Sequence, residues 1–289
     1  MSKYMKALPY LMILPAILFL VVFTFYPMFH MVYLSFFNYD MVTPKEFVGF
    51  KNYDVMFHVA IDFWPAVKNT LIYTFAVVIQ LVFLSLIFAI WLQKSTFLNA
   101  LCQRIMFFPY MCAVISVSMI FQWLLDEKGL INSILQFFKL PVFGGLGSSA
   151  TALLSVILIS TWKNIGYYTL ILLSSLKAIP AEIHEAAELD DTSAFRKFFK
   201  ITVPMLSPQI FFLLITITIS SFRVFETVQT LTEGGPGNST MVLVYYIYKY
   251  AFNYFKYGYA CAAGTVLLVI LMILTLIYFK VVEKKVHYR

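Results

Sequence analysis

The feature that most constrains this chain is a series of continuous apolar runs, several of which reach the roughly 20 residues that an α-helix needs to cross a hydrocarbon core about 30 Å thick. The runs do not alternate in the manner of membrane β-barrel strands. Backbone N–H and C=O groups find no partner in lipid unless they bond within the segment, so each run is predicted to be helical. Because 61% of the 289 residues are hydrophobic and only 12% are charged, an ordinary soluble domain is excluded.

The sequence therefore predicts an all-α, polytopic membrane protein with six transmembrane helices. A single transmembrane domain over residues 1–289 is expected, because no linker rich in Pro, Gly or Ser separates two hydrophobic sets. The longest outside connection covers residues 38–66 and is either a fold over the mouth of the protein or a solvated link between helices. The spans are placed at 9–29, 67–92, 105–125, 150–174, 210–230 and 259–279.

The distribution of Lys and Arg predicts a multi-pass cell-membrane protein with both termini in the cytoplasm. With the N-terminus inside, 12 basic residues fall in cytoplasmic segments and 7 in outside segments. This topology explains the net charge of +7 better than nucleic-acid binding does. The first apolar run follows Lys3 and Lys6 without a small-x-small cleavage site, so it is expected to be a retained helix.

The cytoplasmic loop 177–209 is far longer than a helical hairpin requires, and it is patterned. Pro180 suits the first turn of a helix, and the acidic residues after it complement the positive end of the helix dipole, so a short helix is predicted at 181–189. Capping residue types follow, and then an amphipathic helix predicted at 194–201, which two prolines, Pro204 and Pro208, are expected to end. This unit could dock in a cleft of a cytoplasmic partner or lie on the inner leaflet.

A motif with fixed spacing lies in the same loop. Glu185, Ala186 and Ala187 are followed by three residues to Asp191, and then by nine residues to the run that ends at Pro204. This pattern resembles the EAA motif of bacterial ABC importer permeases, which reads E-A-A, three residues, G, nine residues, I-x-L-P. Asp191 stands where that family usually has Gly, which bears on whether the turn adopts a left-handed conformation, and Val203 replaces the usual Leu.

Further segments resemble the carbohydrate-uptake branch of that family. They are FVGFKNY at 47–53 followed by Phe63, Trp64, Asn69 and Thr70, the run LTEGGPGNST at 231–240, and the ending VHY. The resemblance implies the type I importer permease fold and the translocation of a sugar or oligosaccharide delivered by an extracytoplasmic binding protein. Glycerol-3-phosphate is an alternative solute, because carriers of that compound share these motifs.

The resemblance also implies partners and the residues that meet them. The complex would contain a second, non-identical permease, two ATPase subunits and the binding protein, and the ATPases would hold ATP and Mg. No cofactor is expected in this chain. The outside loop at Gly234, Gly235 and Pro236 would face the binding protein. The residues expected to couple to the ATPase are Glu185, Ala186, Ala187, Asp190, Asp191, Thr192, Ile201 and Pro204.

The chain is expected not to be an enzyme. Neither the GGLG run at 144–147 nor the GGPG run at 234–237 has the Lys that a P-loop requires. His30, His58, His184 and His287 lie on different segments, so no metal site is expected.

Ionisable residues in the apolar runs point to a solute pathway, because a charge at membrane depth costs about 2.5 to 3.5 kcal/mol or more unless it faces protein or water. In the predicted fifth span, polar residues recur at helical spacing, and Arg223 and Glu226 are three apart. They would either line the pathway or form a salt bridge that locks helices together. The candidate pathway residues are Trp162, Lys163, Asn164, Tyr167, Ser220, Arg223, Glu226 and Thr227.

Two rival functions remain open from these residues. An ion-coupled secondary transporter would use Lys163, Arg223 and Glu226 as coupling groups, but it predicts internal repeats and leaves the 177–209 loop unexplained. A membrane-embedded enzyme would need a nucleophile, a metal or an acid–base constellation that the sequence does not offer.

Overall fold

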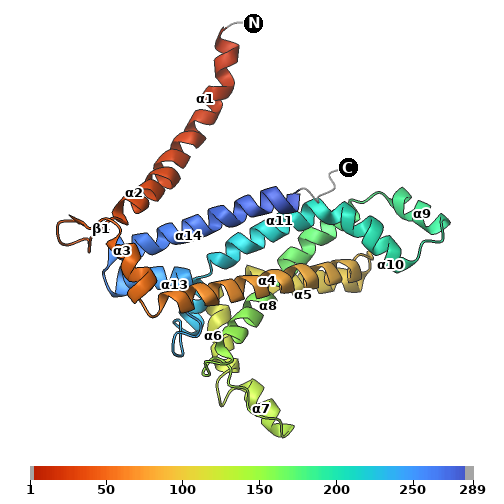
Figure 1. Cartoon of the computed structure of the whole chain (residues 1–289). Coiled ribbons are helices and arrows are strands. Elements are labelled where there is room, and N and C mark those ends of the chain that lie inside the picture. Colours follow the sequence, from red (N-terminus) through yellow and green to blue (C-terminus); the bar gives the residue numbers. More distant parts are fainter. Residues whose placement is uncertain (1–2, 284–289) are drawn as a thin grey trace. The chain divides into compact units, whose positions relative to one another are not determined.

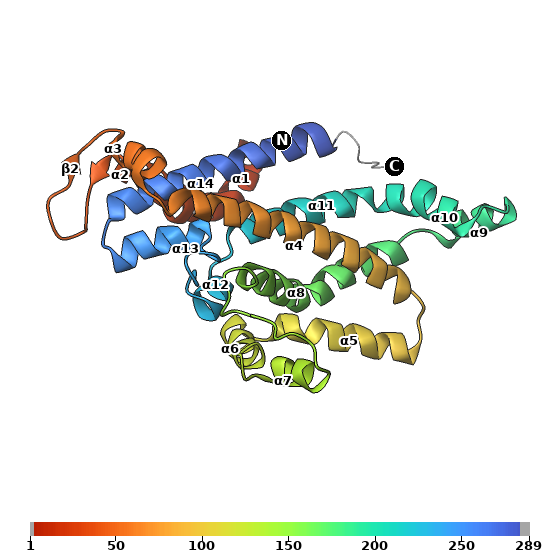
Figure 2. The same ribbon diagram turned by 60° about the horizontal axis from the view of Figure 1, so that its bottom comes forward.

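A computed structural model describes residues 3–283, most of which are helical (Figures 1 and 2). Lys284, Lys285, Arg289 and the VHY ending lie outside the described residues. The chain divides into two compact units. The first holds the described residues up to Phe63 together with Tyr246–Val269, and the second holds Trp64–Tyr245 and the described residues from Ile270 onward.

Five helices of the described chain are long and apolar enough to cross a membrane, and a sharply bent helix pair counts as a sixth crossing. The all-α fold expected from the sequence is confirmed. The five helices are Tyr10–Leu34, Phe63–Trp91, Ala152–Lys177, Ala194–Phe222 and Tyr257–Val281, and the pair is Phe97–Met111 with Val114–Leu124.

The first unit is built on a long N-terminal helix and the compact segment that follows it. Its elements are α1 (Lys3–Leu20), the π-helix η1 (Val21–Phe25), α2 (Tyr26–Leu34), β1 (Phe37–Asn38), β2 (Glu46–Phe47), α3 (Lys51–Asp54), the π-helix η2 (Val55–Val59), the π-helix η4 (Lys249–Asn253) and the first part of α14 (Tyr257–Ile277). The two strands pair antiparallel, with Phe37 opposite Phe47.

The segment 38–66, predicted to lie outside, has a defined structure of its own. The side-chain amide of Asn52 donates to the carbonyls of Ser35 at 2.8 Å and Phe37 at 2.9 Å, which ties α3 to the end of α2. Asp40 accepts hydrogen bonds from the backbone N–H groups of Thr43 and Val42, and these bonds lower the pKa of its carboxyl group. The segment is therefore more than a plain connection between two helices.

The second unit is a bundle arranged around one central helix, α8. Its elements are α4 (Phe63–Trp91), α5 (Phe97–Met111), α6 (Val114–Leu124), α7 (Leu130–Phe137), α8 (Ala152–Lys177), α9 (Ala181–Leu189), α10 (Ala194–Lys197), the π-helix η3 (Phe198–Thr202), α11 (Val203–Phe222), α12 (Glu226–Leu231), α13 (Leu243–Tyr248), the end of α14 and the π-helix η5 (Tyr278–Val282). Figure 2 shows α8 beside α4, α5 and α11.

Gly166 lets α8 approach α5 very closely. A Cβ at this position would lie 1.8 Å from the carbonyl oxygen of Met106, so no larger residue fits without moving a backbone. Small residues at such crossings are the usual means by which membrane helices pack.

The third predicted span, 105–125, is wrong as a single helix. The chain forms two helices, α5 and α6, that meet at 98°. Cys112 and Ala113 between them are extended, with ψ values of 145° and 137°. Pro109 near the end of α5 is one physical cause, because it lacks the N–H that would continue the hydrogen-bond ladder.

The fifth predicted span, 210–230, is wrong at both ends. The helix runs from Ala194 to Phe222 without interruption, so Pro204 and Pro208 do not end it. The π-turn η3 widens the helix just before Pro204, and the Ser207 hydroxyl donates to the Pro204 carbonyl at 2.6 Å, the group that Pro208 leaves without its usual donor. Both prolines are therefore accommodated inside the span.

Candidate functional site

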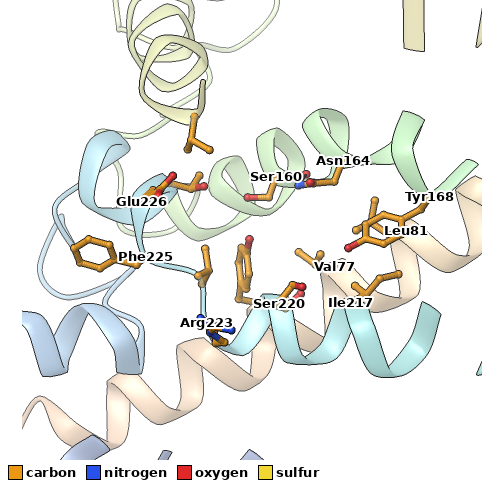
Figure 3. A pocket seen from close by; sticks show the side chains of 15 residues that line it. Val77, Leu81, Ser160, Asn164, Tyr168, Ile217, Ser220, Arg223, Phe225 and Glu226 are labelled. Atoms are coloured by element: carbon orange, nitrogen blue, oxygen red, sulfur yellow. Dashed lines mark hydrogen bonds between the residues drawn. The ribbon is translucent and has the colours of Figure 1, made fainter. Parts of the chain in front are cut away.

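The bundle of the second unit contains an open pocket of about 310 Å³ (Figure 3). Helices α4, α8 and α11 form most of its wall, and α12 and the segment before it complete the rim. The lining side chains are Tyr73, Val77, Leu81, Val114, Ser160, Asn164, Tyr168, Ile217, Ser220, Ser221, Arg223, Val224, Phe225, Glu226 and Thr227.

The pocket combines hydroxyl groups, an amide, two opposite charges and aromatic rings. This mixture suits a solute that carries both polar groups and apolar C–H faces. On α8, the amide N–H of Asn164 donates to the Ser160 carbonyl at 2.8 Å, and no donor from the described residues bonds the amide oxygen. Ser220 and Ile217 face the pocket from α11 (Figure 3).

Arg223 and Glu226 do not form the ion pair that their spacing allowed. No salt bridge joins them among the described residues, and Figure 3 shows the two side chains on different sides of the pocket. Arg223 is the C-cap of α11 and Glu226 opens α12, so each charge lies at the helix end whose dipole favours it. The polar residues that recur at helical spacing in the predicted fifth span, Arg223 among them, do not lie on one continuous helix, because α11 ends at Phe222 and α12 begins at Glu226.

Five of the eight candidate pathway residues line this pocket, namely Asn164, Ser220, Arg223, Glu226 and Thr227. Trp162, Lys163 and Tyr167 do not. Trp162 packs edge-on against Phe121 at 5.2 Å and borders a separate apolar groove.

Lys163 and Tyr167 both contact the end of α5. The Lys163 ammonium donates to the carbonyls of Tyr110 at 3.1 Å and Pro109 at 3.4 Å, and it is only 9% exposed. The Tyr167 ring stacks on the Tyr110 ring at 4.4 Å. Glu226 lies near enough to Lys163 for an electrostatic attraction.

The second candidate region is the elbow, defined as residues 181–202. Its first helix, α9, spans Ala181–Leu189 as the sequence predicted. Asp191 takes the left-handed conformation with φ of 48°. The N–H of Thr192 bonds the Ala187 carbonyl, and the N–H of Asp191 bonds the Glu188 carbonyl, which is the Schellman arrangement that usually places Gly at this position.

The two arms of the elbow are tied together. The Ser193 hydroxyl caps α10 by accepting from the Arg196 N–H, and the Lys197 ammonium lies 2.8 Å from the Glu188 carboxylate. The salt bridge crosses from α10 back to α9, so the two short helices hold one relative orientation.

The outer surface of the elbow is open. Glu185 and Ala186 are exposed on α9, whereas Ala187 is buried at 5%. Asp190 is also exposed, and Thr192, Ile201 and Pro204 are partly buried. Large apolar side chains of the elbow are also exposed, including Leu189, Phe195 and Phe199. Exposed apolar surface of this kind marks a contact site for another protein or for lipid.

The glycine-rich loop 231–240 is held by two adjacent residues in the second turn of α4. The Asn69 amide donates to the carbonyls of Asn238 and Met241, both at 3.0 Å, and the Thr70 hydroxyl accepts from the Leu243 N–H at 2.8 Å. Gly234 has φ of 79°, and a Cβ there would meet the Tyr245 ring at 2.8 Å. Gly235 and Pro236 follow on the same tight turn.

Sequence reasoning missed several lining residues of the pocket. Tyr73 and Tyr168 look like core aromatics on helices whose orientation no pattern reveals. Phe225 and Val114 reach the pocket only because two helices break beside them, and Pro109 was the one signal available for either break. Among the described residues, no group of three or more His, Cys, Asp or Glu side chains is placed to hold a metal ion.

Comparison with known proteins gives a consistent picture. Residues 81–288 match the family described as binding-protein-dependent transport system inner membrane component. The probable ABC transporter permease protein YurN of Bacillus subtilis is 35% identical, with 95% of this chain and 96% of YurN covered. The trehalose/maltose transport system permease protein MalF of Thermococcus litoralis is 31% identical, with 96% and 95% covered.

A solved structure has the same fold. In a bacterial ABC transporter involved in the import of the acidic polysaccharide alginate, one chain superposes with a TM-score of 0.84 at 23% identity, covering 96% of this chain and 95% of that one. The long helices, the family match and the relatives agree. The chain belongs to the family of binding-protein-dependent transport system inner membrane components and is a permease subunit of an ABC importer.

Proposed function

We propose that this subunit carries a sugar or oligosaccharide across the cell membrane through the pocket of the second unit. Relatives named for trehalose/maltose, arabinooligosaccharides and sulfoquinovosyl glycerol, each 30–32% identical, support this class of solute. Polar groups of Asn164, Ser220 and Glu226 would meet hydroxyl groups, and the rings of Tyr73 and Phe225 would meet C–H faces.

A second solute class has one observation in its favour. Arg223 lines the pocket without an ion pair among the described residues, so its guanidinium is available for an anionic group. The sn-glycerol-3-phosphate transport system permease protein UgpA of Shigella flexneri is 31% identical. A phosphorylated polyol is therefore the alternative to a neutral sugar.

The proposed complex supplies what this chain lacks. An extracytoplasmic binding protein delivers the solute to the loop at Gly234, Gly235 and Pro236, and a second, non-identical permease completes the pathway. Two ATPase subunits bind ATP and Mg, and this chain hydrolyses nothing itself. Both termini lie in the cytoplasm, on the same side as the elbow. Membership of this family argues against the ion-coupled secondary transporter.

One observation carries the proposed coupling. The helix that begins in the elbow at Ala194 is continuous to Phe222, a length of 29 residues, and its far end places Ser220 and Ser221 in the pocket. A displacement of the elbow by the ATPase pair therefore moves one wall of the pocket. Alternating access follows if the elbow binds the ATPase differently in the two states, because only a difference in binding free energy shifts their populations.

Glu185→Lys tests this coupling in a reconstituted complex with its ATPase and binding-protein partners. Glu185 is exposed on α9, where it is placed for a charge-assisted hydrogen bond to the ATPase. Such a bond is worth about 1.5–3 kcal/mol, so solute uptake is expected to fall by roughly 10-fold or more, while ATP hydrolysis continues and the subunit remains inserted.

Glu127→Lys is the matched control, because it reverses an exposed acid in the loop between α6 and α7, away from the elbow. It is expected to leave uptake unchanged. Undiminished, ATP-dependent uptake by Glu185→Lys would count against the proposed coupling role of this residue.

A further inference from the structure

The break between α5 and α6 leaves backbone carbonyls without helical partners inside an apolar region. The last four C=O groups of any helix lack intrahelical donors, and in a membrane no water replaces them. The thiol of Cys112 contacts the Phe108 carbonyl at 3.5 Å, and the Cys112 N–H lies 3.3 Å from the Pro109 carbonyl. The Lys163 ammonium donates to the Pro109 and Tyr110 carbonyls, and for Tyr110 it is the only donor found in the described part of the chain.

Lys163 is one of three neighbouring contacts by which α8 holds the end of α5. Gly166, three residues further on, lets the two backbones meet at Met106, and Tyr167 stacks on Tyr110. The Lys163 ammonium also lies 5.5 Å from the centre of the Tyr110 ring, within the range of a cation–π contact. A cation at this place further stabilises the negative end of the α5 dipole.

The bend determines where α6 begins, and α6 contributes to the pocket wall. Val114, the first residue of α6, lines the pocket. Further along α6, the Gln122 amide donates to the carbonyls of Thr230 at 2.6 Å and Leu231 at 3.2 Å, which fixes α6 to α12. Helix α12 in turn places Glu226 and Thr227 on the pocket rim.

From these contacts we propose that Lys163 is a positioning residue, which fixes the bend between α5 and α6 and thereby the wall of the pocket, without touching the solute. A side chain of similar length that lacks donors leaves the Tyr110 carbonyl unsatisfied, and the two helices regain backbone hydrogen bonds only by straightening toward one span. Arg keeps the charge and the donors and is expected to keep the bend.

The bend can be measured directly with a pair of spin labels. Phe97 at the start of α5 and Met119 on α6 are both exposed and accept labels without disturbing the bundle. With a helical rise of about 1.5 Å per residue, a bend of 98° places their Cα atoms about 23 Å apart, and one straight helix places them about 33 Å apart. The labels are introduced as cysteines in a background of Cys102→Ala, Cys112→Ser and Cys261→Ala.

The experiment compares distance distributions in the full-length chain in lipid nanodiscs. The parent and Lys163→Arg are expected to give one short distance, and Lys163→Met a longer and broader distribution. Lys128→Met, which removes an exposed ammonium between α6 and α7, is the control and is expected to match the parent.

Two results overturn the proposal. One is the short parental distance in Lys163→Met, or in the apolar and donor-free Lys163→Leu if the Met variant does not accumulate in the membrane. The other is a long distance in Lys163→Arg. The readout does not depend on the solute, so the proposed function and the role of Lys163 can fail separately.

Discussion

The close approach of α8 to α5 at Gly166 decides whether an Ala substitution there stabilises or destabilises the protein. Gly166→Ala would normally stabilise a helix by about 1 kcal/mol, because Ala has the higher helix propensity. Here the new Cβ would lie 1.8 Å from the Met106 carbonyl oxygen and 2.3 Å from its carbonyl carbon. We therefore expect Gly166→Ala to destabilise the protein.

The size of the destabilisation follows from how far α5 and α8 must move apart to accommodate the new Cβ. Ordinary contact begins at 3.4 Å, so α5 and α8 must move apart by about 1.6 Å along this line, the difference between 3.4 and 1.8 Å. Overpacking of this kind costs about 1–3 kcal/mol or more, which offsets the gain in propensity. The same movement stretches the hydrogen bonds of Lys163 on the neighbouring turn of α8.

Thermal unfolding of the purified protein, followed by tryptophan fluorescence, measures the effect. At about 2–4 °C per kcal/mol, the Tm of Gly166→Ala is expected to fall by several degrees. Gly147→Ala is the matched control, because the Cβ at that position meets only the Gly144 carbonyl oxygen at 3.6 Å. A Tm for Gly166→Ala equal to or above that of the parent would refute the close approach of α8 to α5.

Two further sets of substitutions test the pocket and the elbow. Arg223→Gln and Glu226→Gln are each expected to lower uptake by about 10-fold. Because no ion pair joins the two residues among the described residues, their effects on the free energy of transport are expected to add in the double variant. Normal uptake by an assembled double variant would exclude a transport role for the pair. Asp191→Val is expected to destabilise the left-handed turn by about 1–2 kcal/mol and to speed tryptic cleavage at Arg196 and Lys197. Asp191→Gly is expected to slow this cleavage. Equal cleavage of the Val variant and the parent would show that the turn does not require this conformation.

The first helix of the elbow was predictable because its signals are local. Pro180 and the acidic residues after it mark the start of α9, and the capping cluster marks its end, so the predicted bounds agree with the structure. The family pattern raised the question of a left-handed turn at Asp191, and the φ of 48° answers it. Neighbouring residues determine where a helix ends when their N–H groups can bond its last carbonyls.

The breaks in the spans were not predicted, because Pro109 was the one local signal and the contacts that accompany the bend come from another helix. Apolar runs indicate which segments lie in the membrane, but they do not show whether a helix bends within it. The bend after Met111 depends on Lys163, which is far away in the sequence. The continuity through Pro204 depends on a π-turn that no propensity indicates. Arg223 and Glu226 were interpreted as neighbours on one helix, although each lies at the end of a different one.

The π-turn at Phe198–Thr202 also bears on how this segment can vary in length. Such a turn holds one residue more than an α-turn while the helix on either side keeps its facing. Loss of one residue there would restore a regular α-turn, and the side chains that reach the pocket would still point the same way. The ring of Pro204 would then press on the carbonyl one turn earlier. A one-residue deletion at this place is therefore expected to be tolerated in relatives only where that proline is also replaced.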